Sequence, residues 1–218
     1  IIMSFLMITA MSIMLPRANV AALRINDVLK TKVSVTDPEN PVLPAEDVKG
    51  IVEFDHVSFA YPEAGENVIS DISFKAEKGE TIAVIGSTGS GKSTLVNLIP
   101  RFYDVTKGRV LVDGVDVKDY SPEVLRSRIG IVPQKAVLFA GTIVENLRWG
   151  KKDASKEEMW KALEISQSKE FVEKKDGQLE SRIEQGGKNL SGGQRQRLTI
   201  ARALVRQPEI LILDDSAS

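Results

Sequence analysis

Hydrophobic and polar positions follow different patterns on either side of about residue 47. Residues 1–15 are apolar at 12 of 15 positions and carry no charge, and four of the chain's five methionines recur there at helical spacing. Residues 17–32 continue a partial apolar face, so one helix is predicted from the first residues to about residue 32. Three of the nine prolines fall between residues 38 and 44, which indicates a linker over residues 33–47.

From residue 48 the pattern is typical of an α/β domain. The short apolar run at residues 81–86 ends in glycine, as a buried strand of a parallel sheet would. Ser155 and Glu158 form a capping-box pattern that opens a helix. Because predicted strands alternate with helices, we expect a three-layer α/β domain over residues 48–218. The predicted strands cover residues 51–59, 68–76, 81–86, 109–114, 128–134 and 210–213.

The apolar N-terminal run has two interpretations. It could be a buried helix of a soluble protein, or the end of a transmembrane helix whose full span would need about 20 residues. No basic region precedes it, as a signal peptide would require. We prefer the transmembrane helix. Residues 17–32 carry one acid, Asp27, and four basic residues: Arg17, Arg24, Lys30 and Lys32. This excess of positive charge would place the C-terminal end of the helix on the cytoplasmic side of the membrane.

The sequence GSTGSGKS at residues 86–93 fits the phosphate-loop pattern GxxxxGK(S/T) between a strand-like run and a helix-like stretch. Its glycines let the backbone wrap around a phosphate, and its amides present partial positive charge. Lys92 would reach the β- and γ-phosphates, and the Ser93 hydroxyl would hold Mg²⁺. The alternative is a flexible Gly/Ser turn. The residues expected to contact the nucleotide are Gly86, Ser87, Thr88, Gly89, Ser90, Gly91, Lys92, Ser93 and Thr94.

A second motif, LSGGQ at residues 190–194, narrows the class of nucleotide-binding protein. Ser191 with Gln194 fits a capping box, so a simple helix start explains it locally. The same geometry exposes a hydroxyl and amides at a positive helix terminus, which suits a γ-phosphate. The phosphate loop lies about 100 residues earlier and would hold its own nucleotide. We therefore expect the second motif to serve another subunit's nucleotide through Ser191, Gly192, Gly193 and Gln194.

Composition excludes several other chemistries. The 218 residues carry 29 basic and 30 acidic side chains, so no basic excess supports broad nucleic-acid binding. The chain has 0 Cys, which removes disulfides, thiolate zinc sites and cysteine nucleophiles. Its single histidine, His56, argues against a histidine-based metal site, and we interpret it as a strand surface residue.

Taken together, these motifs resemble the nucleotide-binding domain of an ATP-binding cassette (ABC) exporter, preceded by the end of its last transmembrane helix. Tyr61 in FAYP matches the adenine-stacking aromatic, and Gln134 in VPQ matches the Q-loop glutamine. Residues 138–147 resemble the segment that follows the Q-loop in exporters of this family. The sequence ILILDD at residues 210–215 matches Walker B. The resemblance covers roughly residues 15–218. It implies a P-loop NTPase fold of ABC type, with an antiparallel β subdomain and a helical signature subdomain.

The resemblance further implies an ATP-hydrolysing half-transporter that exports a small molecule, lipid or peptide. Two such domains would sandwich two ATP molecules head to tail, and their closing and reopening would drive the membrane domains. Ser93, Gln134 and Asp214 would hold Mg²⁺, with the domain on the cytoplasmic side of the membrane. A competing class is a soluble cassette ATPase of DNA repair. The apolar residues 1–15 and the net charge of −1 argue against it. A GTPase or kinase would lack LSGGQ.

Asp215 departs from the family, which usually places glutamate there to polarise the attacking water. Aspartate sets its carboxylate about 1.5 Å back, and a displacement of about 1 Å can cost roughly 100-fold in rate. We expect slow hydrolysis at this chain's own site, with Gln134, Lys92 and Asp215 as its catalytic residues. A different partner chain carrying the glutamate would form the other half of a heterodimer. One alternative is a homodimer in which Asp215 supports ATP hydrolysis. The other is a regulatory subunit that mainly holds ATP.

Two further expectations concern the family's remaining elements. The sequence IEQGGKN at residues 183–189 departs from the more common exporter form, although it should still face the membrane domain. The family's switch histidine would follow Ser218, so the chain is expected to be a fragment that is inactive alone.

Overall fold

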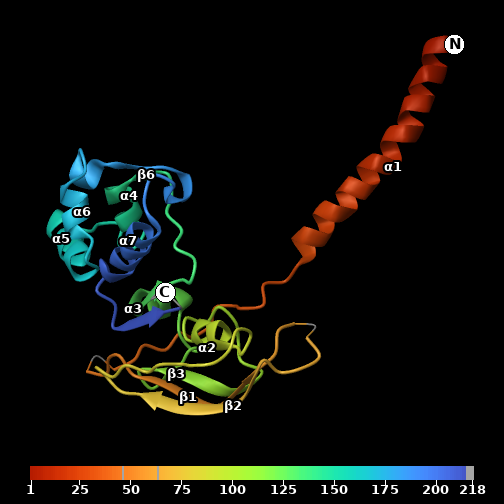
Figure 1. Cartoon of the computed structure of the whole chain (residues 1–218). Helices are drawn as coiled ribbons and strands as arrows, with labels where there is room; N and C mark the ends of the chain where they lie inside the picture. The colour runs from red at the N-terminus through yellow and green to blue at the C-terminus, as the bar shows by residue number, and fades with distance from the viewer. Residues whose placement is uncertain (46, 63, 215–218) are drawn as a thin grey trace. The chain divides into compact units, whose positions relative to one another are not determined.

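The computed structural model describes residues 1–45, 47–62 and 64–214. The chain divides into two compact units, Ile1–Thr36 and Asp37–Ser218. The first unit is one helix, α1 (Ile2–Lys30), as the apolar pattern predicts (Figure 1). The hydroxyls of Thr9 and Ser12 donate back to carbonyl oxygens four residues earlier, and no residue of α1 is buried. By length and composition α1 can cross a membrane, with a mean hydropathy of 1.5 over its most apolar window.

The second unit begins with an antiparallel sheet in the order β2-β1-β3-β4. Its strands are β1 (Val52–Phe59), β2 (Ile69–Ala76), β3 (Lys107–Val112) and β4 (Val115–Asp116). The predicted strands at residues 51–59, 68–76 and 109–114 are therefore confirmed. The register of β1 shifts between Asp55 and Ser58, where His56 has a φ of +50°. A Cβ added to Gly108 would lie 2.3 Å from the His56 carbonyl oxygen, so this bulge requires a glycine opposite it.

Two short helices pack on this sheet and build the first core. They are α2 (Lys92–Leu98) and α3 (Pro122–Arg128). Phe54 stacks on Phe74 with ring centroids 4.6 Å apart, and Leu98 and Leu125 are fully buried nearby in the same core. Tyr120 is also buried, and its hydroxyl donates to the Val112 carbonyl oxygen at 2.8 Å. Burial, reinforced by the charge of Asp113, raises the pKa of Tyr120 to about 12.

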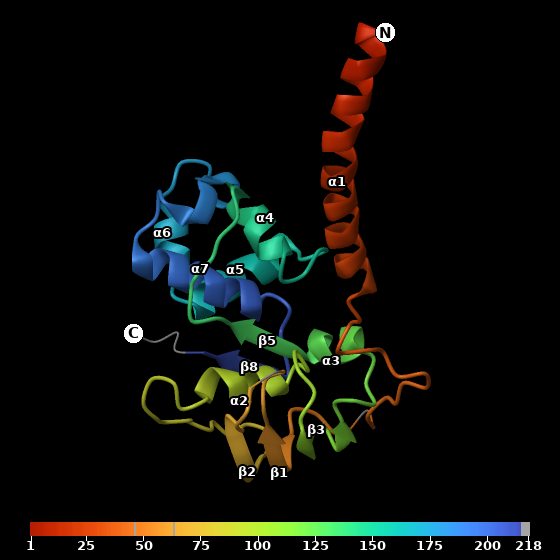
Figure 2. The same ribbon diagram turned by 90° about the vertical axis from the view of Figure 1, so that its right-hand side faces the viewer.

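A pair of parallel strands, β5 (Ile129–Val132) and β8 (Ile210–Leu213), confirms the predicted strands at residues 128–134 and 210–213. These strands lie between the antiparallel sheet and the helices α4–α7 (Figure 2). The strand predicted at residues 81–86 is wrong: residues 81–87 have no regular structure, and Ile82 and Ile85 are 48% and 92% exposed. A parallel strand is buried by pairing with neighbours, and this segment does not pair with β8 among the described residues.

The remaining elements form a helical subdomain with its own core. Its helices are α4 (Ile143–Arg148), α5 (Lys156–Ile165), α6 (Lys169–Glu173), α7 (Gly192–Leu204) and the short η1 (Gln178–Glu180) and η2 (Gln185–Gly187). Strands β6 (Gly141–Thr142) and β7 (Arg182–Ile183) pair beside them. Capping boxes open α4, α5 and α7, which confirms those predicted at Ser155 and Ser191. The fold class is thus the predicted one: α/β with an antiparallel sheet and a separate helical subdomain.

The segment between α1 and β1 has no helix or strand in its described residues. That agrees with a linker, while the exact boundaries expected at residues 32 and 47 stay predictions.

Candidate nucleotide-binding site

The phosphate-loop motif forms an exposed loop that leads into α2. Gly89 and Gly91 have φ angles of +84° and +89°, a region that other residues rarely adopt. A Cβ added to Gly86 would lie 2.5 Å from the Ser90 hydroxyl oxygen. The loop's own geometry therefore favours glycine at positions 89 and 91, and a side chain at position 86 would displace that of Ser90. Residues 87–90 are all exposed, which leaves the loop open to a phosphate, and the Ser90 amide donates to the Ser87 carbonyl oxygen at 3.1 Å.

Lys92 places its charge on this loop. Its ammonium donates to the carbonyl oxygens of Gly86 at 2.8 Å and Ser87 at 2.9 Å. An ammonium has three N–H donors, so one remains for a phosphate oxygen. Both contacts are to neutral carbonyl groups, and Lys92 has no ion pair among the described residues. The loop therefore keeps a positive charge that suits a polyphosphate.

Ser93 and Asp214 meet beside the loop although 121 residues separate them. The Ser93 hydroxyl donates to an Asp214 carboxylate oxygen at 2.9 Å. Asp214 directly follows β8, and Gln134 follows the neighbouring parallel strand β5 at the same edge. The Asp214 amide also donates to the Val132 carbonyl oxygen at 3.0 Å, which fixes Asp214 against β5. A hydroxyl and a carboxylate oxygen side by side fit the oxygen ligands that Mg²⁺ prefers.

Tyr61 lies close to the start of α2. Its hydroxyl shares a hydrogen bond with the Thr94 hydroxyl at 3.0 Å. Its ring meets Phe59 and Tyr103 edge to face, with centroids 4.9 Å and 5.2 Å away. The aromatic is therefore held beside the phosphate loop, while its contact with adenine stays a prediction. Sequence reasoning missed Tyr103, because no motif marks it and only the fold brings it to Tyr61.

The signature motif begins α7 as predicted. The Ser191 hydroxyl accepts from the Gln194 amide at 3.2 Å, and the Gln194 side chain accepts from the Ser191 amide at 3.0 Å. A Cβ added to Gly193 would meet nothing within 4 Å, and one added to Gly192 would meet only a guanidinium nitrogen at 3.9 Å. Glycine lowers helix stability by about 1 kcal/mol relative to alanine. Since no contact among the described residues requires these glycines, they suit close approach by another molecule.

The structure thus brings together the phosphate loop, Ser93, Asp214 and the Tyr61–Thr94 pair. Among the hydrogen bonds of the described residues, none joins residues 190–194 to this group. That separation agrees with a signature that serves a second subunit, which stays a prediction. Asp215, expected to act on the attacking water, lies outside the described residues.

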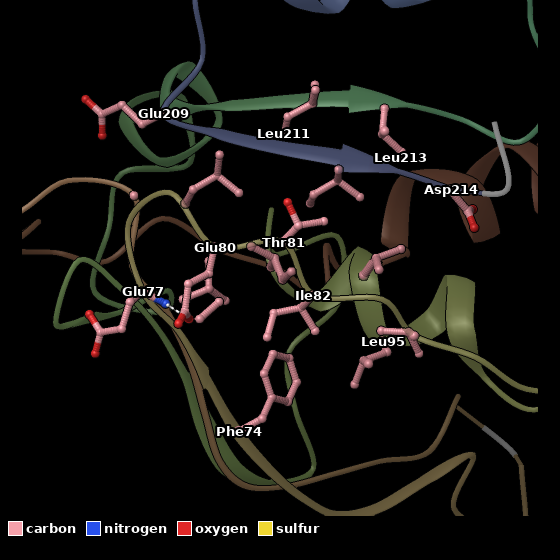
Figure 3. Close-up of a pocket in the computed structure, with 18 of the residues that line it drawn as sticks. Phe74, Glu77, Glu80, Thr81, Ile82, Leu95, Glu209, Leu211, Leu213 and Asp214 are labelled. Carbon is pink, nitrogen blue, oxygen red and sulfur yellow. Dashed lines mark hydrogen bonds between the residues drawn. The ribbon is translucent and has the colours of Figure 1, made fainter. Parts of the chain in front are cut away.

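An apolar cavity of about 550 Å³ lies between residues 79–84, α2 and β8. Figure 3 shows Ile82 and Leu95 on one side and Leu211 and Leu213 of β8 on the other. Lys92 and Asp214 line only part of it; Glu77, Glu80 and Glu209 also line it, and the remaining walls are mainly hydrocarbon. Hydrocarbon walls do not bind phosphate and carboxylates repel it, so the loop and the Ser93–Asp214 pair are the better candidate site for a nucleotide.

Comparisons with known proteins point to one family. The family model described as ABC transporter matches residues 69–218. An uncharacterized ABC transporter ATP-binding protein of Mycobacterium tuberculosis is 50% identical over 221 residues, which cover 100% of this chain and 38% of that protein. A Bacillus subtilis protein named as a multidrug export ATP-binding/permease protein is 46% identical over 183 residues, 84% of this chain and 31% of that protein.

The structural comparison agrees. The structure of a bacterial Atm1-family ABC exporter with ATP bound matches with a TM-score of 0.83 and 34% sequence identity, over 92% of this chain and 35% of that chain. The present chain spans about 38% of the length of its mycobacterial relative.

Proposed function

The chain belongs to the ABC transporter family, and from that premise we propose that it binds Mg·ATP as the ATP-binding part of an exporter half-transporter. The observation that carries the proposal is the Ser93–Asp214 hydrogen bond of 2.9 Å beside the Lys92 loop. This hydrogen bond joins the phosphate-loop motif to the Walker B motif, and together they can hold a metal ion next to a phosphate. The relatives' names and the apolar helix α1 support a membrane exporter, and the basic residues that follow residue 15 support a cytoplasmic position for this domain.

Each part of the site has a distinct role in holding the nucleotide. The exposed amides of the loop and the Lys92 ammonium bind the β- and γ-phosphates, because both present positive charge to the same anion. Tyr61, tethered to Thr94, offers its ring as a platform for adenine. Ser93 and Asp214, with Gln134 at the same edge, hold the metal. When bound, Mg²⁺ neutralises charge that develops on the phosphates.

We further propose that hydrolysis requires two nucleotide-binding domains. The Ser191 hydroxyl and the amides of Gly192 and Gly193 cap the γ-phosphate of ATP held by the second subunit. Binding of ATP then closes the two domains, and hydrolysis reopens them, which moves the membrane-spanning parts between inward- and outward-facing states. The exported solute, a small molecule, lipid or peptide, is selected by the membrane-spanning parts.

The first test concerns ATP binding. Lys92→Ala removes the ammonium from the loop and is expected to abolish ATP binding by the full-length protein. Lys107→Ala, at the exposed start of β3, is the matched control, since it removes the same charge away from the loop. Equilibrium binding of a fluorescent ATP analogue measures both variants. Retained affinity in Lys92→Ala would contradict the phosphate-loop assignment.

A second test separates an active site from one that mainly holds ATP. We propose that Asp215 makes this chain's own site slow, so that a partner chain with glutamate performs most hydrolysis. Asp215→Glu advances the carboxylate by about 1.5 Å and is expected to raise ATP turnover at least 10-fold, given that about 1 Å can be worth roughly 100-fold. Unchanged turnover would favour a site in which Asp215 already works. Mass spectrometry of the parent complex then identifies one or two kinds of half-transporter.

A further inference from the structure

Arg195 lies one turn into α7, and its side chain folds back onto the loop that leads into the helix. One guanidinium nitrogen donates to the Leu190 carbonyl oxygen at 2.7 Å and, more weakly, to the Gly187 carbonyl oxygen at 3.4 Å. The Leu190 carbonyl belongs to the peptide unit that joins Leu190 to Ser191. The N–H of the same unit donates to the Gln194 side chain at 3.0 Å. Two side chains of α7 therefore hold both polar ends of that peptide unit.

The stem of Arg195 is held in place by packing. It covers Gly187, which is buried and has a φ of +69°. A Cβ added to Gly187 would lie 2.8 Å from Arg195 Cδ and 2.9 Å from Cγ. The absence of a side chain at Gly187 thus lets Arg195 reach Leu190. Neither contact belongs to the capping box, which Ser191 and Gln194 complete by themselves.

We propose that Arg195 is a positioning residue that sets the direction of the Ser191 hydroxyl toward the second subunit's ATP. The inference rests on the proposed function and deepens it. The orientation of the Leu190–Ser191 peptide unit determines where the Ser191 side chain points, and Arg195 provides one of its two anchors. Without this anchor the unit can rotate, and a displacement of about 1 Å at a reacting group can cost roughly 100-fold in rate.

The first experiment compares two arginines of the same helix in the full-length transporter. Arg195→Gln removes the anchor. Arg197→Gln is the matched control, because Arg197 also donates to a carbonyl oxygen, that of Gln167 at 3.1 Å, but away from the signature. We expect Arg195→Gln to lower kcat for ATP hydrolysis by about 10- to 100-fold. ATP binding at the phosphate loop should stay within about twofold, and Arg197→Gln should change neither quantity.

Ser191→Ala is the reference that separates the two proposals. If Ser191→Ala leaves kcat unchanged, the proposed role of the signature fails. If Ser191→Ala lowers kcat but Arg195→Gln leaves kcat at the value of the unsubstituted protein, the positioning role of Arg195 is overturned. Arg195→Lys, which retains the charge but not the planar fork, should restore only part of the rate.

A glycine pair tests the same contact while Arg195 is kept, and it decides the question if Arg195→Gln does not fold. Gly186 and Gly187 have φ angles of +71° and +69°, so alanine strains the backbone similarly at both. At Gly186 a Cβ would meet nothing within 4 Å, whereas at Gly187 it would push Arg195 away. We expect Gly187→Ala to lower kcat and Gly186→Ala to keep most of it. Equal losses would assign the effect to backbone strain and overturn the proposal.

Discussion

His56 is the only histidine in the chain, and it lies in the bulge of β1. Its ring shares a hydrogen bond of 2.7 Å with the Asp71 carboxylate on β2. This bond, followed by the charges of Asp71 and Asp55, raises the pKa of His56 above its ordinary value of 6.5. A raised pKa in the folded state means that protonation favours folding, so the exposed pair contributes to stability only while His56 is charged.

This pair gives a pH-dependent prediction at the residue scale. Its stabilising contribution should be complete below about pH 6.5, the ordinary pKa in the unfolded chain, and should disappear as pH rises through the higher folded-state pKa. NMR titration of the single imidazole measures that pKa directly. Asp71→Asn is expected to lower it toward 6.5, with the charge of Asp55 still in place, and to reduce the pH-dependent difference in unfolding midpoint. An unchanged imidazole pKa in Asp71→Asn would refute the assignment.

How far single residues could be predicted depended on how far apart their partners lie in sequence. The capping box of Ser191 and Gln194 is visible in the sequence because its partners are three positions apart. The Ser93–Asp214 contact could be expected only because each residue belongs to a motif with a known partner. The bond of Tyr61 to Thr94 spans 33 positions and has no local signal, so only the fold reveals it.

At the scale of elements, Arg128 ties three segments of the second unit together. It ends α3, and its guanidinium lies 2.9 Å from Asp113 of the β3–β4 turn and 2.9 Å from Glu209, which precedes β8. The Asp113 side chain has 0% exposure, and it also accepts from the Ile51 amide at 2.9 Å. A buried carboxylate that loses its cation is costly, because neither water nor another charge compensates it.

Arg128→Ala is therefore expected to lower the free energy of unfolding by about 3–5 kcal/mol. The control is Arg109→Ala, which breaks the ion pair of Arg109 with Asp55 across β1 and β3, where the arginine side chain is 59% exposed. Exposed pairs contribute about 0–1 kcal/mol, so the control should change little. Urea unfolding measures both variants. Equal losses would mean that Arg128 does not act through the buried carboxylate.

Strands could be predicted from the sequence where an apolar or alternating segment also pairs with a neighbouring strand in the fold. The alternating strand at residues 51–59 and the apolar runs of β5 and β8 were predicted and are present. Residues 81–86 have the same apolar composition, yet they form no strand, because a strand depends on a partner edge that its own sequence does not specify. The bulge near His56 escaped prediction for a related reason: the register shift arises between strands, opposite Gly108.

At the scale of the whole molecule, the role of α1 depends on its surroundings. None of its residues is buried, although its surface includes exposed Phe5, Ile8 and Met11. Apolar side chains in this number are unfavourable in water, whereas a bilayer would accept them. Basic residues, among them Lys30 in the last turn, would then remain at the cytoplasmic face. Membrane insertion of α1 is therefore the arrangement that we propose for the parent protein.

Thiol labelling can test this arrangement, since the present sequence contains no cysteine. Ile8→Cys and Lys32→Cys, in the chain expressed in cells, provide one thiol each. Both positions are exposed within the chain, so without a membrane a polar maleimide should label them at similar rates. Inserted in a bilayer, Cys at position 8 should be protected at least 10-fold, while Cys at position 32 should react from the cytoplasmic side. Equal labelling at both positions would instead assign α1 to an aqueous environment, and detergent should abolish the difference if the lipid causes it.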